Sequence, residues 1–186
     1  MKILIIVGVV AVVVAIVYAG CATSRAGYAS APYKVLQQDG KYEVREYPTL
    51  TIVQTPMRVA DDSFMRLFRY IDGQNAATQK IAMTTPVFMT TNSMAFVMPE
   101  KLPADHVPQP NNNQVAIASI PAGQFAVLRF KGGRNAANET NAVAALTARL
   151  QRENLTPAGE PIFGYFDPPW TPVWLRRNEV MLRLAP

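Results

Sequence analysis

The stretch Asp61-Asp62-Ser63-Phe64-Met65-Arg66-Leu67-Phe68-Arg69-Tyr70-Ile71 is the clearest helix signal in this chain of 186 residues. Asp is a favoured helix N-cap, and early acidic side chains suit the positive end of the helix dipole. Large apolar side chains recur from Phe64 at i, i+3, i+4 and i+7, which makes one apolar stripe. Gly73 follows as a natural stop. We therefore predict a helix that begins at residues 61 to 63 and ends before Gly73.

Strand signals lie on both sides of this helix, and the second half of the chain repeats the order. The segments are rich in β-branched residues or alternate in polarity, and Pro86 bends or breaks one of them. Each half reads β-β-α-β-β, which predicts an α+β domain: one antiparallel sheet or distorted barrel with two helices packed on it. The predicted strands are 33–40, 42–47, 50–57, 80–90, 94–98, 115–120, 124–130, 161–166 and 173–184, and the second helix spans about 138–153.

The first 21 residues are typical of a bacterial lipoprotein signal. One cation, Lys2, precedes an unbroken apolar segment from Ile3 to Ala19, and Gly20-Cys21 follows. We predict a cleaved signal peptide over 1–20, a lipidated tether over 21–32 and a folded domain over 33–186. Because the apolar segment has about 17 residues, an uncleaved membrane anchor is an alternative, and a buried core helix is a second one.

Cysteine usage agrees with a lipid anchor. Cys21 is the only cysteine, so the chain has no internal disulfide and must rely on its core. Acyl chains on Cys21 would hold the protein on a lipid membrane. Ala22 follows it, where lipoproteins kept at the inner membrane commonly carry Asp. We therefore predict a lipid-anchored protein of the cell envelope, on the periplasmic face of the outer membrane.

Composition and charge argue against two function classes. The net charge is +5, but the basic residues are scattered and form no continuous stripe, so we expect no nucleic-acid partner. No Cys-His pair, Gly-rich phosphate loop or metal-ligand spacing is present, so we predict a binding protein and no enzyme or metal site. We expect it to be a monomer.

Four motifs in order resemble those of the SOUL haem-binding family. The strongest is Lys80-Ile81-Ala82-Met83-Thr84-Thr85-Pro86-Val87. Tyr42-Glu43-Val44-Arg45 precedes it, and Gly164-Tyr165-Phe166-Asp167-Pro168-Pro169-Trp170 and Arg176-Arg177-Asn178-Glu179-Val180 follow it. The resemblance covers about residues 33 to 184 and implies a twisted antiparallel β-barrel of two pseudo-symmetric β-β-α-β-β halves with two flanking helices.

The resemblance also implies a ligand and a site. Family members bind tetrapyrroles at a hydrophobic surface beside the first helix, which points to Phe64, Phe68 and Arg69 here. Thr171 stands where animal members carry a basic residue, which weakens the expected contact with a propionate. We therefore predict weak binding of haem or a related tetrapyrrole, through apolar contacts with few or no axial ligands.

Other interpretations stay open at this point. Taken alone, the stripe from Phe64 to Ile71 equally fits the core face of a helix. Glu179 either pairs with an arginine such as Arg177 or points into a cleft like that of bacterial effector-binding domains, where it would attract a cationic ligand. The second case predicts a sensor or buffer of amphipathic small molecules. A structural envelope lipoprotein without a ligand is the third hypothesis.

Two further residue types are candidates for contact with haem iron. Histidine and methionine both ligate haem iron in proteins. His106 is the only histidine, and we expect it in an exposed, Pro-rich loop. Four methionines on two predicted strands are expected mainly to fill the core, or to line a promiscuous pocket. These are Met83, Met89, Met94 and Met98.

Overall fold

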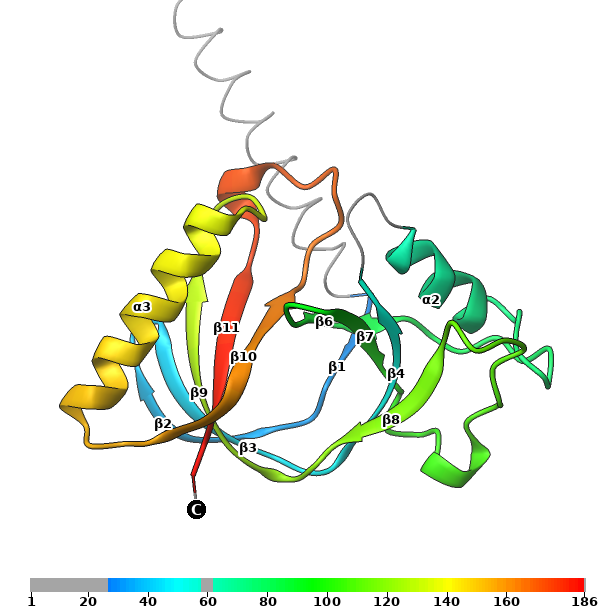
Figure 1. Cartoon of the computed structure of the whole chain (residues 1–186), viewed down its shortest axis with the longest axis horizontal. Helices are drawn as coiled ribbons and strands as arrows, with labels where there is room; N and C mark the ends of the chain where they lie inside the picture. The colour runs from blue at the N-terminus through cyan, green and yellow to red at the C-terminus, as the bar shows by residue number, and fades with distance from the viewer. Residues whose placement is uncertain (1–26, 58–61, 186) are drawn as a thin grey trace, which may run out of the picture.

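The computed structural model, which describes residues 27–57 and 62–185, contains one large antiparallel sheet and two α-helices (Figure 1). The helices are α2 (Ser63–Ile71) and α3 (Ala136–Arg152). The prediction of an α+β domain with two helices is therefore confirmed. The strands of the sheet are β2 (Lys34–Asp39), β3 (Tyr42–Tyr47), β4 (Leu50–Pro56), β6 (Val87–Met89), β7 (Ser93–Val97), β8 (Ala116–Ile120), β9 (Gly123–Phe130), β10 (Pro157–Tyr165) and β11 (Asn178–Leu184).

The strand order mixes the two halves of the chain. It runs β2-β3-β9-β11-β10-β6-β7-β4-β8, and all neighbours are antiparallel. Strand β3 of the first half pairs with β9 of the second, and β8 of the second half pairs with β4 of the first. Strands β2 and β8 are the edges of the sheet, and no pairing between them occurs in the part of the chain described. Closure into a barrel and a symmetry of the halves therefore stay predictions.

Three predicted segments differ from the observed strands, one of them because β10 begins at Pro157 and not at the predicted residue 161. The predicted strand 80–90 is reduced to β5 (Thr84–Thr85) and β6, with Pro86 between them. The predicted closing strand begins only at Asn178, because a short 3₁₀ helix, η2 (Val173–Leu175), and a loop precede it. Pro86 separates β5 from β6, since proline lacks the N–H that a sheet ladder needs, and Pro172 is the N-cap residue of η2.

The start of the domain also differs from the predicted boundary. Strand β1 (Ala29–Ser30) pairs in parallel with β5, although both of its residues lie in the range predicted as a tether. Ala31 is buried, so these residues belong to the folded domain. The predicted signal peptide 1–20 and the lipidation site Cys21 lie outside the described residues. Among the residues described, no helix is both long and apolar enough to cross a bilayer.

Both helices cover the same face of the sheet. On β6 and β10, Val87 is the cross-strand partner of Tyr165, so their side chains share a face. Val87 packs in one cluster with Leu67 of α2, and the Tyr165 hydroxyl donates a hydrogen bond to Glu139 of α3. Figure 1 shows α3 over one part of the curved sheet and α2 over another, with β6 and β10 between them.

The other face of the sheet holds a separate core. Strands β4 and β9 are not neighbours, yet Leu50 and Ile52 of β4 pack with Phe125 and Val127 of β9. The sheet must therefore curve strongly enough to bring distant strands together. Figure 1 shows this curvature. The helices are thus bound to the outside of a self-supporting sheet, which leaves part of each helix free for other contacts.

Candidate functional site

Helix α2 leaves two phenylalanines largely exposed. Phe64 is 42% and Phe68 is 39% exposed, whereas Leu67, Tyr70 and Ile71 are buried. Successive helical residues are about 100° apart, so Phe64 and Phe68 lie together on one flank of the buried face. Their rings lie 6.1 Å apart between centroids and are inclined by only 14°. Leu67 and Ile71 of the predicted stripe therefore belong to the core face, whereas Phe64 and Phe68 do not.

The aromatic flank is supported by the sheet. The Phe64 ring makes an edge contact with Phe96 of β7, with centroids 5.3 Å apart. Phe96 is buried, so it fixes the position of Phe64 from below. Toward α3 the sheet continues with Met89 and Phe163, which are cross-strand partners and only partly buried. Apolar surface therefore extends from the exposed phenylalanines over the sheet between the two helices.

The opposite flank of α2 is polar. Arg66 donates hydrogen bonds to the Thr55 hydroxyl at 3.0 Å, the Pro56 carbonyl at 3.0 Å and the Ser63 hydroxyl at 3.2 Å. Thr55 and Pro56 belong to β4, which lies next to the edge strand β8. The two flanks of α2 thus face different parts of the sheet and present different chemistry.

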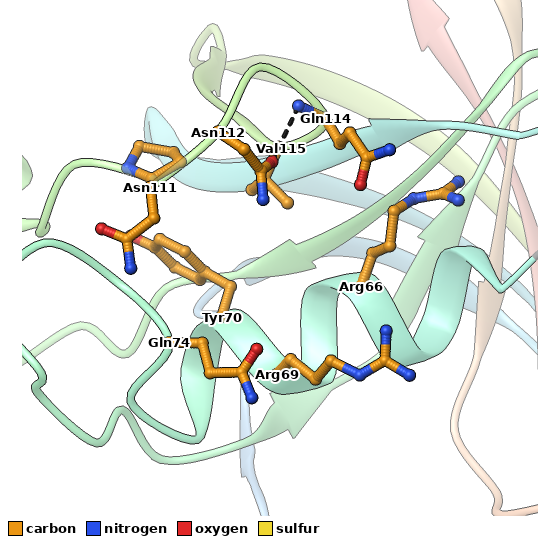
Figure 2. Close-up of a pocket in the computed structure, with 9 residues that line it drawn as sticks. Arg66, Arg69, Tyr70, Gln74, Asn111, Asn112, Gln114 and Val115 are labelled. Atoms are coloured by element: carbon orange, nitrogen blue, oxygen red, sulfur yellow. Dashed lines mark hydrogen bonds between the residues drawn. The ribbon is translucent and has the colours of Figure 1, made fainter.

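A small polar pocket lies on this second flank. Its volume is about 100 Å³, and Figure 2 shows Arg66 extending from α2 toward Gln114. Tyr70 points toward the loop that carries Asn111 and Asn112, and its hydroxyl donates to the Pro108 carbonyl at 2.6 Å. Pockets for drug-sized ligands span about 300–1,000 Å³. This pocket therefore holds at most a small polar group such as a carboxylate.

Arg69 connects the two flanks. It lines the polar pocket and forms an ion pair with Asp62 at 3.1 Å, with both side chains about half exposed. An exposed ion pair of this kind contributes about 0–1 kcal/mol. The structure therefore brings Phe64 and Phe68 together, and it places Arg69 on the same helix, beside them but in a polar setting.

A second hollow lies at the other end of the sheet, where β2 and β3 meet the turn between β8 and β9. It is wide and open, with a volume of about 620 Å³. Tyr33 and Tyr47 provide aromatic surface, and Lys34 provides a cation at its edge. No local sequence pattern indicates this hollow, because its lining comes from segments far apart in the chain.

Glu179 is fully buried and bound by arginines. Its carboxylate accepts two hydrogen bonds from Arg45, at 2.7 and 2.9 Å, and two from Arg177, at 3.0 Å from Nε and 2.6 Å from Nη2. The predicted pairing with an arginine is confirmed. Arg45 was not recognised as the main partner, because β3 and β11 are separated by 134 residue positions and joined only through β9.

The same cluster contains further charges. Glu43 accepts hydrogen bonds from Arg45 Nε at 2.6 Å and from Arg129. Burial alone would raise the pKa of the Glu179 carboxyl, but the hydrogen bonds and charge of Arg45 and Arg177 hold it below its usual range. A cationic ligand would have to displace these arginines to reach Glu179.

The methionines and His106 have structural positions. Met94 and Met98 are buried, and Met83 and Met89 pack against the same cluster beneath α2. His106 lies on a 3₁₀ helix, η1 (Ala104–His106), and is exposed, with its Nδ1 3.1 Å from Asp105. The expectations of core methionines and an exposed histidine are both confirmed. Among the described residues, no group of three His, Cys, Asp or Glu side chains could hold a metal ion.

The loop between β10 and β11 was only partly understood from the sequence. Thr171 is 2% exposed, so it is not available to a ligand, whereas the adjacent Trp170 is 80% exposed. Trp174 is also exposed, at 70%. Periodicity could not reveal these side chains, because the segment is irregular. The only sequence feature that pointed to this loop was the presence of two tryptophans in a Pro-rich segment.

Comparison with known proteins agrees with these observations. Residues 28–183 match the family described as SOUL heme-binding protein. No curated protein is similar enough in sequence to count as a match. The matched range begins close to β1 and ends within β11, so it covers nearly all of the described domain.

Several solved structures share the fold at low sequence identity. The EcmrR C-terminal domain has a TM-score of 0.58 at 13% identity, covering 82% of this chain and 98% of that one. An uncharacterized conserved protein from Listeria innocua has a TM-score of 0.59 at 8% identity, covering 78% and 92%. A hydrolase from Listeria innocua has a TM-score of 0.57 at 8% identity, covering 81% and 94%. Such identities demonstrate a common fold alone.

Proposed function

The chain belongs to the SOUL haem-binding family, and we propose that it binds haem or a related tetrapyrrole as a non-catalytic protein lipid-anchored in the cell envelope through Cys21. The observation that carries this proposal is the exposed, nearly parallel pair Phe64 and Phe68 on α2. Large apolar side chains on a short surface helix are usually turned inward. A ligand with a flat apolar face would cover both rings at once.

The residues on α2 fit the two chemical parts of a haem. The macrocycle needs apolar contact, which Phe64 and Phe68 offer and which Phe96 supports from below. The propionates need a cation, and Arg69 lies on the same helix. Its present partner, Asp62, is exposed, so exchange for a propionate costs little.

Contact with the macrocycle, without coordination of the iron, is the binding mode we propose. Bound haem would bring its own iron chemistry, which the protein tunes through the ligands and the polarity of its surroundings. His106, the only histidine, is exposed on η1, with its Nδ1 3.1 Å from Asp105. The buried carboxylates of Glu43 and Glu179 are bound by arginines, which makes them poor general acids or bases.

The cationic-ligand hypothesis has less support. It requires a carboxylate with unsatisfied charge facing a cleft, whereas Glu179 already accepts hydrogen bonds from Arg45 and Arg177. The hypothesis of a ligand-free envelope protein gives no reason for the exposed phenylalanines. Both remain outcomes of the following experiment.

Titration of the purified protein with hemin, followed at the Soret band, tests the proposal. We expect a saturable spectral shift below tens of micromolar. Burying a phenylalanine stabilises by about 1.5–3 kcal/mol, and 1.4 kcal/mol is tenfold in affinity. Phe68→Asp should therefore weaken binding about tenfold or more, and Arg69→Glu should weaken it by a smaller factor.

Two variants serve as controls. Leu36 on the edge strand β2 is exposed to almost the same degree as Phe68, so Leu36→Asp makes a matched change away from α2. Lys34→Glu tests the second hollow. Neither should alter hemin affinity. Equal losses in Phe68→Asp and Leu36→Asp, or no spectral shift with the unaltered protein, would refute the proposed site.

A further inference from the structure

The loop between β10 and β11 exposes both tryptophans of the chain. The sequence contains two tryptophans, and Trp170 and Trp174 are 80% and 70% exposed. Val173 lies between them in sequence and is also exposed. Tryptophan is highly buried on average in folded proteins. An apolar surface of this kind on one loop is therefore a candidate for contact with a membrane or a protein partner.

The loop is held in a defined conformation. The Asp167 carboxylate accepts a hydrogen bond from the backbone N–H of Arg177 at 2.6 Å. Arg176 donates to the Thr171 carbonyl at 2.8 Å and to the Pro169 carbonyl at 2.5 Å. With Thr171 buried as well, the loop is anchored between its tryptophans. The exposure of the two rings is thus built into the fold.

The chain enters the domain at the same end. Strand β1 runs parallel to β5, and β5 leads through Pro86 into β6. Pro86 lies against Gly164 near the end of β10, since a Cβ on Gly164 would lie 3.3 Å from it. Because β6 runs antiparallel to β10, residues that precede Val87 lie beyond the end of β10, where the tryptophan loop begins. Figure 1 shows the described chain starting near that loop.

The predicted lipid anchor is close to this entry point in the chain. Six peptide steps separate Cys21 from Gly27, the first described residue. Each residue spans at most about 3.3–3.6 Å, so Gly27 lies within roughly 20 Å of an acylated Cys21. A lipid-anchored chain must therefore hold the tryptophan end of the domain close to the bilayer surface.

We propose that Trp170, Val173 and Trp174 form a membrane-docking surface, which seats the domain on the bilayer that holds Cys21. The inference rests on the lipid anchor proposed above. Tryptophan prefers the bilayer interface, where its ring is apolar and its N–H stays hydrated. The position of the chain entry favours a lipid surface over a protein partner.

Basic side chains stand beside this surface. A Cβ on Gly133 would lie 3.8 Å from Val173, which places the loop before α3 next to the tryptophan loop. That neighbouring loop carries the exposed residues Lys131 and Arg134. Cations at this position would attract anionic lipid headgroups. The docking surface thus combines interfacial aromatic rings with a basic rim.

Tryptophan fluorescence reports on this loop alone, because the chain has no other tryptophan. The full lipidated chain is reconstituted into phosphatidylcholine vesicles that contain a fraction of phosphatidylglycerol. We expect the emission to shift to the blue and to be quenched by brominated lipid. The reference sample is Cys21→Ala in buffer, without detergent or vesicles. Acrylamide should quench the vesicle-bound chain at least about twofold less than this reference.

A relocated tryptophan provides the control. In a Trp170→Phe, Trp174→Phe background, Leu36→Trp puts the reporter on the exposed edge strand β2, and it should remain open to acrylamide on vesicles. Flotation of the vesicles reports on the anchor separately. A chain that floats while Trp170 and Trp174 stay in water overturns the docking surface and leaves the anchor intact. A chain that does not float overturns the anchor, and the docking surface with it.

Discussion

Helices α2 and α3 cover the same face of one sheet but use their apolar residues differently. α3 has 17 residues and buries Ala142, Leu146 and Leu150, and none of its large apolar side chains is exposed. α2 has nine residues and exposes Phe64, Met65 and Phe68. Because both helices pack on the same face, packing on the sheet alone does not require this difference. We infer that α3 serves stability, whereas α2 divides its apolar surface between the core and a ligand.

The helix starts show the same contrast. The Asn135 side chain at the N-cap of α3 accepts a hydrogen bond from the Asn138 backbone N–H at 2.9 Å. At the N-cap of α2, Asp62 makes no such bond and pairs with Arg69 instead. The start of α3 is therefore stabilised locally, and the start of α2 presents its charges to the surface.

The largest expected effect concerns the sheet that carries both helices. Replacing Glu179 by alanine leaves Arg45 buried without its main partner. Breaking a buried ion pair in this way costs about 3–5 kcal/mol. Urea unfolding should show a loss of this size in the free energy of unfolding. A loss below about 1 kcal/mol would mean that the cluster does not support the sheet.

A core change in α3 separates stability from binding. Leu146 is fully buried, so Leu146→Ala should lower the free energy of unfolding by about 2–5 kcal/mol. The folded fraction should bind hemin as the unaltered protein does. Phe68→Ala should show the reverse, with a change in stability within about 0.5 kcal/mol, as is usual for surface sites. Similar losses of hemin affinity in Leu146→Ala and Phe68→Ala would contradict the proposed difference in role between α3 and α2.

Acid should weaken the sheet through the buried carboxyl of Glu179. The pKa of the Glu179 carboxyl is held below its usual value of 4.5. A carboxyl with a lowered folded pKa contributes stability that is present above pH 4.5 and is lost as the pH falls through the folded value. The slope for one group is at most about 1.4 kcal/mol per pH unit. Urea midpoints measured from pH 7 to pH 3 should fall only below 4.5, and less steeply in Glu179→Gln.

The smallest effects compare the two N-caps. Asn135→Ala removes a capping hydrogen bond and should lower the free energy of unfolding by about 1 kcal/mol. Asp62→Ala removes no cap and should change it by less than about 0.5 kcal/mol. Thermal unfolding of the two variants at one protein concentration provides the comparison. Equal losses would show that Asp62 has a capping role that its geometry does not indicate.

Local patterns were sufficient to predict both helices and most strands, because helical and strand periodicities are properties of neighbouring residues. They could not predict which flank of α2 is buried. The stripe from Phe64 to Ile71 was correct as a periodicity, but Tyr70 reaches the core in place of Phe68, and the Pro108 carbonyl satisfies its buried hydroxyl.

Contacts between distant strands were harder to predict. Glu179 and Arg45 lie two strands apart in the sheet, and only the position of β9 between β3 and β11 brings them together. The exposure of Trp170 and Trp174 depends on hydrogen bonds of Arg176 within an irregular loop. The site residues Phe64, Phe68 and Arg69 came from family resemblance, and their exposure is what the structure adds.

Hydrogen–deuterium exchange with and without hemin tests the central claim most directly, because it follows both helices in the unaltered protein. If α2 holds the ligand, backbone amides of residues 63–71 should exchange more slowly when hemin is bound, and those of residues 136–152 should be unchanged. Slower exchange confined to α3, or to residues 32–34 and 46–48 at the second hollow, would contradict this account.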